Sequence, residues 1–358
     1  AYGGSSPPAR GRGGAGAPRG GGGAPPGAGG GAGAPHDALL RVTHASTCGT
    51  DLHIYRGAVP GFEPGTVIGH EFVGEVAAVG AAVRRLRPGQ RAACADFVAC
   101  GECESCAAGR HAQCGERRLF GFSGLQPRLD GGLAEYVRVP RADVALSPLA
   151  AGADPRFGLL SGDVMPTALG ALQRLALAPG ERLAVVGAGP VGVLTAWLAA
   201  RRGVEVLLLE ASPARAARAR GGGLAVAEIA AGQPLSDAAP GLAGVFDAAV
   251  DAVGGESGLK TALAALRPRG RLVGAGSQAG RFELDWGALM QREIALQFVI
   301  GDPIGLRGEV EAAMADCAPA LDLMFSDRLR LDEVPDYFAA LYRRERFKAL
   351  VEVAGEAA

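Results

Sequence analysis

Apolar and polar positions divide the chain into two kinds of pattern. Between about residues 38 and 158, short apolar runs typical of β-strands, such as residues 38–43 and Phe72–Val79, are separated by turns rich in Gly and Pro. From about residue 160, apolar strand-like runs alternate with Ala-rich helical stretches. Such alternation is typical of a parallel, doubly wound sheet. We therefore predict an α/β protein in which a β-rich region precedes a doubly wound one.

The pattern also locates individual elements of the second region. Buried strands are predicted at residues 183–187, 204–210, 245–251, 271–276 and 295–300. Two helical stretches, at residues 309–317 and 331–343, precede a last strand at 347–353. The uncharged stretch 183–200 is long enough for a membrane span. Its spaced glycines, and the arginines that follow, favour a buried strand, turn and helix instead.

Changes of pattern give the predicted domain boundaries. Residues 1–35 are rich in Gly and Pro and have no hydrophobic period. We expect them to be disordered, because they cannot bury enough apolar surface to offset the entropy lost on ordering. The β-rich region is predicted to form one domain at 36–160 and the doubly wound region a second domain at 161–303. Residues 304–358 are expected to return to the first domain.

Composition narrows the function classes. The chain is 48% hydrophobic and 20% charged, as in ordinary globular proteins, and its net charge is −1. This charge gives no reason to expect binding to nucleic acid or to a membrane surface. The N-terminus has no apolar signal core, and four of the seven cysteines fall within residues 100–114. Clustered cysteines indicate a metal site in a reducing compartment, so we predict a cytoplasmic protein.

A glycine-rich turn follows the first predicted strand of the doubly wound region. Its residues are Gly187, Ala188, Gly189, Pro190, Val191 and Gly192, and Glu210 ends the next strand. This G-x-G-x-x-G spacing between a strand and a helix is typical of dinucleotide binding. The glycines allow a tight turn, approach of the pyrophosphate and close helix packing. A carboxylate at Glu210 suits a ribose diol and repels a 2′-phosphate, so NAD is favoured over NADP.

Four cysteines form a second motif, with the spacing C-x2-C-x2-C-x7-C. They are Cys100, Cys103, Cys106 and Cys114. Four thiolates in one loop can close a tetrahedron around Zn²⁺, which makes a structural site. An iron–sulfur cluster is the main alternative, but its usual last gap is three residues before a proline. Two disulfides are a further alternative, and His111 in the same loop is expected to be a solvated side chain.

A reactive site is predicted around Cys48 and His70. A thiolate and an imidazole are a natural pair of zinc ligands, although each residue alone is more often a buried structural one. The only acid in the next candidate stretch is Asp163. Three protein ligands would leave a fourth position for water or substrate, as in catalytic zinc sites. We place the 48–53 segment in a loop of the β-rich region.

These motifs together carry a family resemblance. They are C-G-T-D-L-H at 48–53, G-H-E-F-V-G-E-V at 69–76, the four-cysteine loop, D-G-G-L-A-E-Y-V at 130–137, G-D-V-M-P-T at 162–167 and G-A-G-P-V-G at 187–192. Over about residues 37–353 the sequence resembles the zinc-containing medium-chain alcohol dehydrogenases. It is most similar to the formaldehyde-dehydrogenase-like, sorbitol and threonine dehydrogenase group. The resemblance implies a GroES-like catalytic domain and a Rossmann domain.

The resemblance also implies roles for single residues. Two zinc ions per chain are expected, one structural and one held by Cys48, His70 and Asp163 with Glu71 beside it. Asp51 would orient His70. Thr50 would take the substrate proton and pass it through the cofactor ribose to His53. The remaining implied positions are Gly254 and Gly276 along the nicotinamide half of the cleft, and Lys348 near the cofactor phosphates, where an ordinary surface lysine is an equal alternative.

The implied function is hydride transfer between NAD and a primary or secondary alcohol, or an aldehyde adduct. A homodimer or homotetramer that pairs through residues 295–300 is expected from the same resemblance. The family normally begins with β-strands under the catalytic domain, whereas here residues 1–35 are Gly-, Pro- and Arg-rich and begin with Ala1. A frameshift, a mis-assigned start or a fragment would explain this difference. The alternative function is a catalytically silent NAD-binding scaffold.

Overall fold

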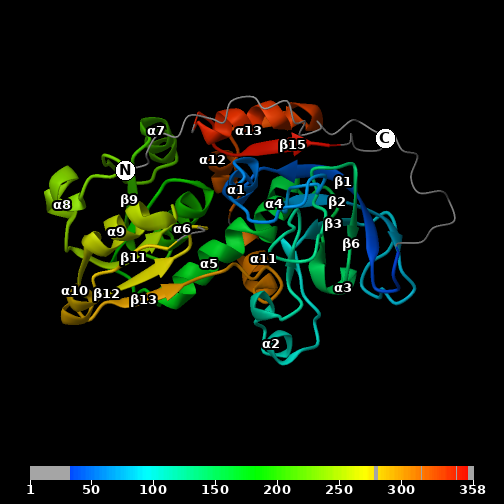
Figure 1. The fold of residues 1–358 in the computed structure, drawn as a ribbon, viewed down its shortest axis with the longest axis horizontal. Helices are drawn as coiled ribbons and strands as arrows, with labels where there is room; N and C mark the ends of the chain where they lie inside the picture. Colours follow the sequence, from blue (N-terminus) through cyan, green and yellow to red (C-terminus); the bar gives the residue numbers. More distant parts are fainter. Residues whose placement is uncertain (1–32, 278–280, 316, 344, 354–358) are drawn as a thin grey trace.

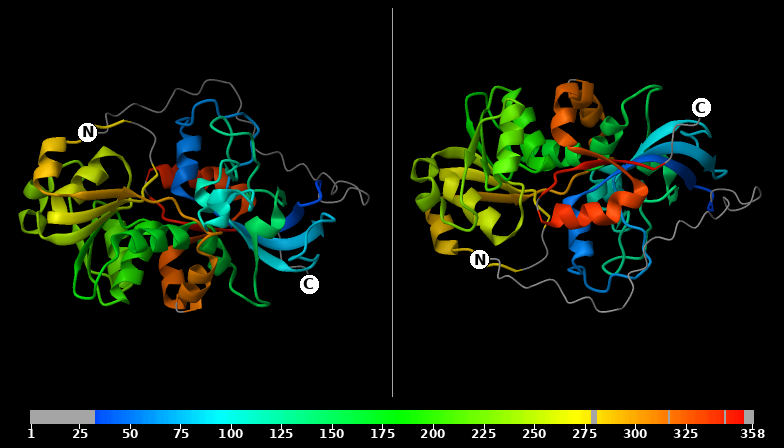
Figure 2. Two further views of the ribbon diagram at one scale, coloured as in Figure 1. Left: turned by 90° about the horizontal axis from the view of Figure 1, so that it is seen from below. Right: turned by 90° about the horizontal axis from the view of Figure 1, so that it is seen from above.

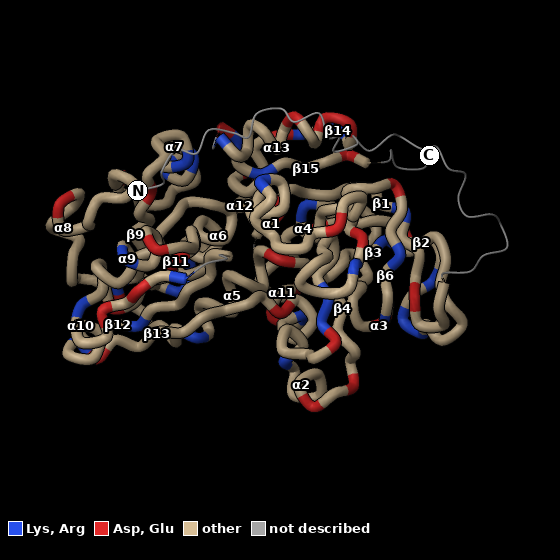
Figure 3. Tube along the Cα trace, in the orientation of Figure 1, with Lys and Arg blue, Asp and Glu red and all other residues tan. Residues whose placement is uncertain are grey.

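The computed structural model describes residues 33–277, 281–315, 317–343 and 345–353, and two sheets organise them (Figure 1). Most of residues 1–35, which we expected to be disordered, lie outside the described residues. One sheet is built from strands within residues 38–148 and two C-terminal strands, and the other from strands within residues 182–298. Figure 2 shows the C-terminal strand running into the first sheet. Basic and acidic residues are interspersed along both halves (Figure 3).

The first sheet has seven strands, most of them antiparallel. Its order is β14 (Asp327–Arg330), β15 (Ala349–Glu352), β1 (Ala38–Ser46), β2 (Phe72–Val79), β3 (Arg91–Cys94) and β7 (Leu146–Pro148), with β6 (Tyr136–Val139) also paired with β1. Ala45 of β1 lies opposite both Phe72 of β2 and Val351 of β15. The C-terminal strand is therefore part of the core of the β-rich half. The short strands β4 (Phe97–Val98) and β5 (Arg118–Leu119) pair with each other in a separate two-stranded sheet.

The second sheet has six parallel strands in the order 3-2-1-4-5-6 of a Rossmann fold. They are β10 (Val226–Glu228), β9 (Glu205–Glu210), β8 (Arg182–Val186), β11 (Phe246–Asp251), β12 (Leu266–Gly274) and β13 (Ala295–Phe298). Side chains of β8 alternate between two cores. Leu183 and Val185 join the core that contains α5 (Val164–Leu175) and α6 (Pro190–Ala200), whereas Ala184 and Val186 join the core that contains α9 (Gly255–Ala265). Helices thus cover both faces, as the unbroken apolar strands predicted.

Helices connect and cover these sheets. They are α1 (Gly49–Tyr55), α2 (Glu104–Ala107), α3 (Ala142–Ala145), α4 (Pro155–Gly162), α5 (Val164–Leu175), α6 (Pro190–Ala200), α7 (Pro213–Gly221), α8 (Leu235–Ala238), α9 (Gly255–Ala265), α10 (Trp286–Gln291), α11 (Arg307–Ala315), α12 (Ala318–Met324) and α13 (Val334–Tyr342), with 3₁₀ turns at His111–Gln113, Pro240–Leu242 and Leu331–Glu333. Asp154 is the N-cap of α4 and its carboxylate accepts the N–H of Arg156, while Pro155 occupies the first turn of the helix.

The predicted elements correspond to observed ones, but several observed elements differ from the prediction or were not predicted, among them α12 and β14. Residues 49–55, expected in a loop, form helix α1, which Cys48 caps. The three-residue strand β10 was not predicted, because so short a run has no readable period. Strand β12 begins at Leu266, before the predicted residue 271, since its early residues are mostly polar. The stretch 183–200 is a strand, turn and helix, and no described helix has the length and hydropathy to cross a membrane.

Candidate catalytic metal site, cysteine loop and cofactor turn

Four metal-binding side chains from separate elements meet at one point. Cys48 caps α1, His70 and Glu71 directly precede β2, and Asp163 joins α4 to α5. One ligand atom from each of these four residues lies within 4.8 Å of the others. From the sequence, the proximity of Cys48, His70 and Asp163 was only a hypothesis. The fold brings the three side chains to one point.

Contacts within this cluster define its geometry. Nε2 of His70 lies 3.5 Å from Oδ2 of Asp163, and the Cys48 thiol lies 3.4 Å from the same oxygen. On the other side of the ring, Nδ1 of His70 lies 3.2 Å from Oδ1 of the buried Asp51. The second oxygen of Asp51 accepts the backbone N–H of Cys48 at 3.0 Å. Asp51 thereby fixes both the imidazole and the start of α1, as expected for a residue that orients a ligand.

The electrostatics of the cluster suit a divalent cation. Burial and the charge of Asp163 raise the pKa of Cys48. Burial lowers the pKa of His70, but the charges of Asp51 and Cys48 outweigh it and the net shift is upward. Several ionisable groups are thus crowded in a largely buried site, where a cation would compensate their anionic forms. A thiolate, an imidazole and carboxylates are also the donors that zinc prefers, so the residues present fit this metal.

Lys348 lies at this site, not at the cofactor phosphates, so the sequence-based placement was wrong. Its side chain is 1% exposed, and its ammonium contacts Oε2 of Glu71 and the carbonyl oxygen of Thr47. Burial alone would lower the pKa of Lys348, but the charge of Glu71 outweighs it and the net shift is upward. Burial raises the pKa of Glu71 to about 7, against the opposing charge of Lys348. One signal was available in the sequence: Lys348 is one of only two lysines in an arginine-rich chain.

The two residues of the proposed proton path lie on α1. Thr50 is in the first turn of the helix and is partly buried. His53 is one turn further and contacts the guanidinium of Arg56. Burial and the charge of Arg56 lower the pKa of His53, while a bond to the backbone of Ser277 raises it. Helix α1 therefore meets the loop after β12, which joins the metal site to the Rossmann half.

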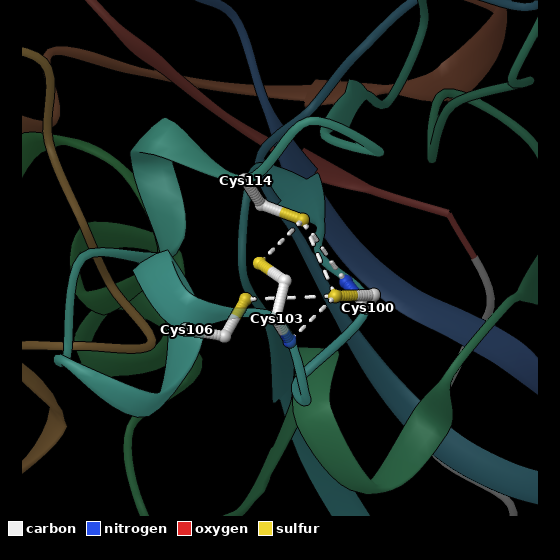
Figure 4. A group of neighbouring side chains, drawn as sticks. All are labelled: Cys100, Cys103, Cys106 and Cys114. Atoms are coloured by element: carbon white, nitrogen blue, oxygen red, sulfur yellow. Dashed lines mark hydrogen bonds between the residues drawn. The ribbon is translucent and has the colours of Figure 1, made fainter.

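The cysteine loop brings its four sulfur atoms together (Figure 4). Cys114 and Cys100 are 3.6 Å apart, Cys100 and Cys106 3.8 Å, and Cys103 and Cys114 3.9 Å. Four sulfurs about 2.3 Å from one zinc would be about 3.8 Å apart, whereas a disulfide needs about 2.05 Å. Backbone N–H groups of residues 102 and 103 lower the pKa of Cys100 to about 7, which favours a thiolate. The loop geometry thus fits a four-thiolate zinc site.

His111 is not among these donors. It was expected to be solvated, but its side chain is only 15% exposed and lies 3.9 Å from the carboxylate of Asp302. The same carboxylate accepts the N–H of Ala112. The end of the cysteine loop is therefore attached to the segment after β13.

The glycine turn has the backbone that its sequence predicted. Gly187 adopts φ +95°, a conformation that side chains with a Cβ rarely take. A Cβ on Gly192 would lie 1.9 Å from the carbonyl oxygen of Gly187, so this glycine permits the close approach of α6. A Cβ on Gly189 would meet only Arg215, at 4.0 Å. The surface over Gly189 is therefore open at the N-terminus of α6, where Pro190 and Val191 begin the helix and where phosphates bind favourably.

Glu210 is more constrained than the sequence suggested. Its carboxylate is buried and accepts the backbone N–H of Ala188 at 2.6 Å and of Ser212 at 2.7 Å. Each oxygen keeps a second lone pair. Glu210 thus braces the glycine turn and still presents a carboxylate at the end of β9.

Gly254 and Gly276 lie side by side at the ends of adjacent strands β11 and β12. Gly254 has φ +77°, and a Cβ on Gly276 would lie 2.0 Å from its backbone nitrogen. Asp251 accepts the N–H of Gly254 at 3.1 Å and fixes this turn. The two glycines therefore form a tightly packed edge close to Ser277.

Two features of the site escaped the sequence argument. One is the ion pair of Lys348 with Glu71, described above. The other is Asp96, between β3 and β4, whose Oδ1 is buried and has no hydrogen-bond partner among the described residues. A single acid in the otherwise apolar segment before Cys100 was the signal that could have drawn attention to it.

Comparisons with known proteins agree with this arrangement. Residues 34–149 match the alcohol dehydrogenase GroES-like domain, and residues 190–318 match the zinc-binding dehydrogenase domain. L-threonine 3-dehydrogenase of Chelativorans sp. (strain BNC1) is 30% identical over 89% of this chain and 92% of its own length. L-galactonate-5-dehydrogenase of Escherichia coli (strain K12) is 37% identical, but the match spans half of each chain.

Solved structures show the same fold. Alcohol dehydrogenase TADH from Thermus sp. ATN1 has a TM-score of 0.78 and 31% identity, over 89% of this chain and 93% of its own. A zinc-binding dehydrogenase from Sinorhizobium meliloti 1021, solved bound to NADP, has a TM-score of 0.75 and 28% identity, over 89% and 92%.

Proposed function

The chain belongs to the zinc-containing medium-chain alcohol dehydrogenase family, and from this we propose that it oxidises a primary or secondary alcohol, or an aldehyde adduct, with NAD as hydride acceptor. Its relatives make it an oxidoreductase that acts on CH–OH groups. The observation that carries the finer proposal is the convergence of Cys48, His70, Glu71 and Asp163 within 4.8 Å. The reverse reaction, aldehyde or ketone reduction, uses the same groups.

In this proposal Cys48, His70 and Asp163 hold the catalytic zinc, with Glu71 as a neighbouring or exchanging ligand. When bound, the zinc supplies a Lewis acid that favours the ionised form of the substrate hydroxyl. Asp51 keeps the His70 ring oriented, with Nε2 toward Asp163 and Cys48. The four-cysteine loop holds a second, structural zinc and attaches to Asp302 through Ala112.

Thr50 and His53 provide the route for the proton. The hydroxyl of Thr50 would accept the substrate proton, and the imidazole of His53, one turn further along α1, would receive it on its way to solvent. Because burial and Arg56 lower the pKa of His53, its ring is neutral and able to accept that proton near neutral pH. Solvent then takes the proton, since His53 is partly exposed.

Binding of the dinucleotide is assigned to the glycine turn. The open surface of Gly189 and the N-terminus of α6 would hold the pyrophosphate, and Gly254 and Gly276 would border the nicotinamide end. When bound, NAD accepts the hydride. The negative charge of Glu210, buried beside the turn, opposes a 2′-phosphate and supports NAD over NADP.

Self-association through β13 is part of the proposal. This strand is an edge of the Rossmann sheet, and large apolar side chains near it are exposed: Trp286 by 78%, Met290 by 65% and Phe298 by 62%. An exposed apolar edge strand is a ready surface for pairing with another copy. Light scattering after size exclusion should give a dimer or tetramer.

Zinc content and turnover together test the function. Native mass spectrometry of the purified protein should give two zinc ions per chain. With a panel of alcohols, absorbance should show faster formation of NADH from NAD than of NADPH from NADP. A protein that holds two zinc ions and NAD but oxidises none of the alcohols would contradict the proposal and favour the silent scaffold.

A further inference from the structure

The cysteine loop is attached to the segment that leads from β13 into α11. One oxygen of the Asp302 carboxylate accepts the N–H of Ala112, in the loop, at 3.0 Å. The other oxygen accepts the N–H of Gly305 at 2.8 Å, so one side chain fixes both segments. Ile304 also packs against the cluster of the four cysteines. The side chain of Asp302 is only 13% exposed, so the loss of its two hydrogen bonds would be costly.

The residue before Asp302 lies directly against the candidate metal ligand Asp163. A Cβ on Gly301 would lie 3.3 Å from the carbonyl oxygen of Asp163 and 2.5 Å from the hydroxyl oxygen of Thr167. Thr167 donates to the same carbonyl oxygen, from its hydroxyl at 2.9 Å and from its backbone N–H at 3.1 Å. The backbone of Gly301 is therefore seated on the first turn of α5, where Asp163 is held.

These contacts form a continuous path between the two candidate metal sites. It runs from the cysteine loop through Ala112 to Asp302, and from Asp302 through Gly301 to Asp163. Chains of packed and hydrogen-bonded groups of this kind can carry energetic coupling between two sites. Metal sites are also ordered by the ion that they bind, so the end of the cysteine loop is best fixed when its four thiolates are held together.

We propose that Asp302 is a positioning residue that couples zinc binding in the cysteine loop to zinc binding at the catalytic cluster. An ordered loop fixes Ala112, Asp302 then holds Gly301 in place, and Asp163 is kept in position to act as a ligand. Coupling between two binding sites is reciprocal, so occupation of either site strengthens zinc binding at the other. This inference rests on the proposed function, in which the chain holds two zinc ions.

Competition for zinc between the holoenzyme and a chelating dye measures this coupling without turnover. Cys106→Ser reports zinc binding by the catalytic cluster alone, and Cys48→Ser reports zinc binding by the cysteine loop alone. We define the coupling ratio as the product of these two single-site dissociation constants divided by the product of the two dissociation constants of the wild type. We expect a coupling ratio of at least tenfold, which corresponds to about 1.4 kcal/mol.

Replacement of Asp302 tests its part in the coupling. When Asp302→Ala is introduced into all three proteins, both N–H groups lose their acceptor, and the coupling ratio should fall to about one. A purely structural role of Asp302 would lower the thermal midpoint and leave the coupling ratio unchanged. Asp285→Ala is the matched control, because Asp285 likewise accepts a backbone N–H, that of Ala288 at 2.9 Å, but at the start of α10 in the Rossmann half. This control should retain the coupling ratio of the wild type.

A second variant serves if Asp302→Ala misfolds, which thermal unfolding would reveal. Asp302→Asn has a similar shape, but its amide oxygen can replace only one of the two carboxylate oxygens as an acceptor. One of the two segments is then released, so the coupling ratio should again fall toward one. An unchanged ratio in Asp302→Asn would overturn the inference.

The outcomes distinguish the inference from the function on which it rests. A wild-type coupling ratio near one would overturn the coupling, and a ratio that Asp302→Ala leaves unchanged would overturn the part of Asp302. In both cases the dehydrogenase function stands. A wild type that holds a single zinc ion per chain, in the cysteine loop, would overturn both.

Discussion

The ammonium group of Lys348, just before the last strand, is buried against the carboxylate of Glu71 at the start of β2, 277 residues earlier in the chain. Neither side chain is more than 1% exposed. Lys348 also donates to the carbonyl oxygen of Thr47, next to Cys48. The C-terminal segment thus contributes a charge to a site that the N-terminal segments build, and Glu71 depends on it for compensation.

Replacing Lys348 by Met should therefore destabilise the protein strongly. Removal of one partner leaves the other charge buried and unpaired, which typically costs about 3–5 kcal/mol. Urea unfolding at pH 7 measures this change. The double variant Lys348→Met/Glu71→Gln, which removes both charges, should recover much of the loss. If the single variant is as stable as the wild type, the buried pair is not ionic.

Cysteine substitutions should separate the two zinc sites. In Cys48→Ser we expect one zinc per chain in place of two and turnover at least 10³-fold lower, because the catalytic ligand set is incomplete. NAD binding should be unchanged, since the glycine turn lies on another sheet. In Cys106→Ser the remaining zinc should be the catalytic one, and the thermal midpoint should fall. Native mass spectrometry measures the zinc content of both variants, and a fluorescence titration with NADH measures cofactor binding. Undiminished turnover of Cys48→Ser would contradict the assignment of Cys48 as a catalytic zinc ligand.

Sequence periodicity was sufficient for most of the fold because buried parallel strands are continuous apolar runs. The strand Phe72–Val79 was predicted with its observed ends, and the turn that begins at Gly187 was predicted from its glycine spacing between a strand and a helix. Helix α1 was missed. Its seven residues are too few for a readable period, and Cys48 as a cap is not a usual helix signal.

The site was predictable only as far as residue types determine chemistry. Cysteine and histidine spacing indicated a metal site, but the position of Lys348 beside Glu71 depends on the pairing of β15 with β1. Pairing between strands so distant in sequence is a property of the whole fold. For the same reason the contact of Asp96 with Gly162, which joins two loops, has no local signature.

Two glycine substitutions should separate cofactor binding from folding. A Cβ at Gly189 would lie over open surface, so Gly189→Ala should fold with an unchanged thermal midpoint. It should weaken NAD by at least tenfold, since the added methyl occupies the approach of the pyrophosphate. Gly192→Ala places a Cβ 1.9 Å from the carbonyl oxygen of Gly187 and should cost about 1–3 kcal/mol of stability. Calorimetric NAD titration and thermal unfolding of both variants measure these two effects. Normal NAD binding by Gly189→Ala, or a wild-type stability of Gly192→Ala, would contradict the prediction.

The charge of Arg56 should set the pH dependence of alcohol oxidation. His53 must be neutral to accept the proton, so the rate rises as pH increases through the pKa of His53. Burial and Arg56 lower that pKa, which places the rise at lower pH. Arg56→Gln removes one of these causes, so the pKa of His53 increases and the acid limb of kcat moves to higher pH. An exposed charge contact is worth about 0.2–1 kcal/mol, so turnover below the limb should fall by up to roughly fivefold. Arg56→Lys, which keeps the charge, is the matched control and should retain the wild-type profile. A limb that stays in place in Arg56→Gln would mean that His53 does not carry the proton.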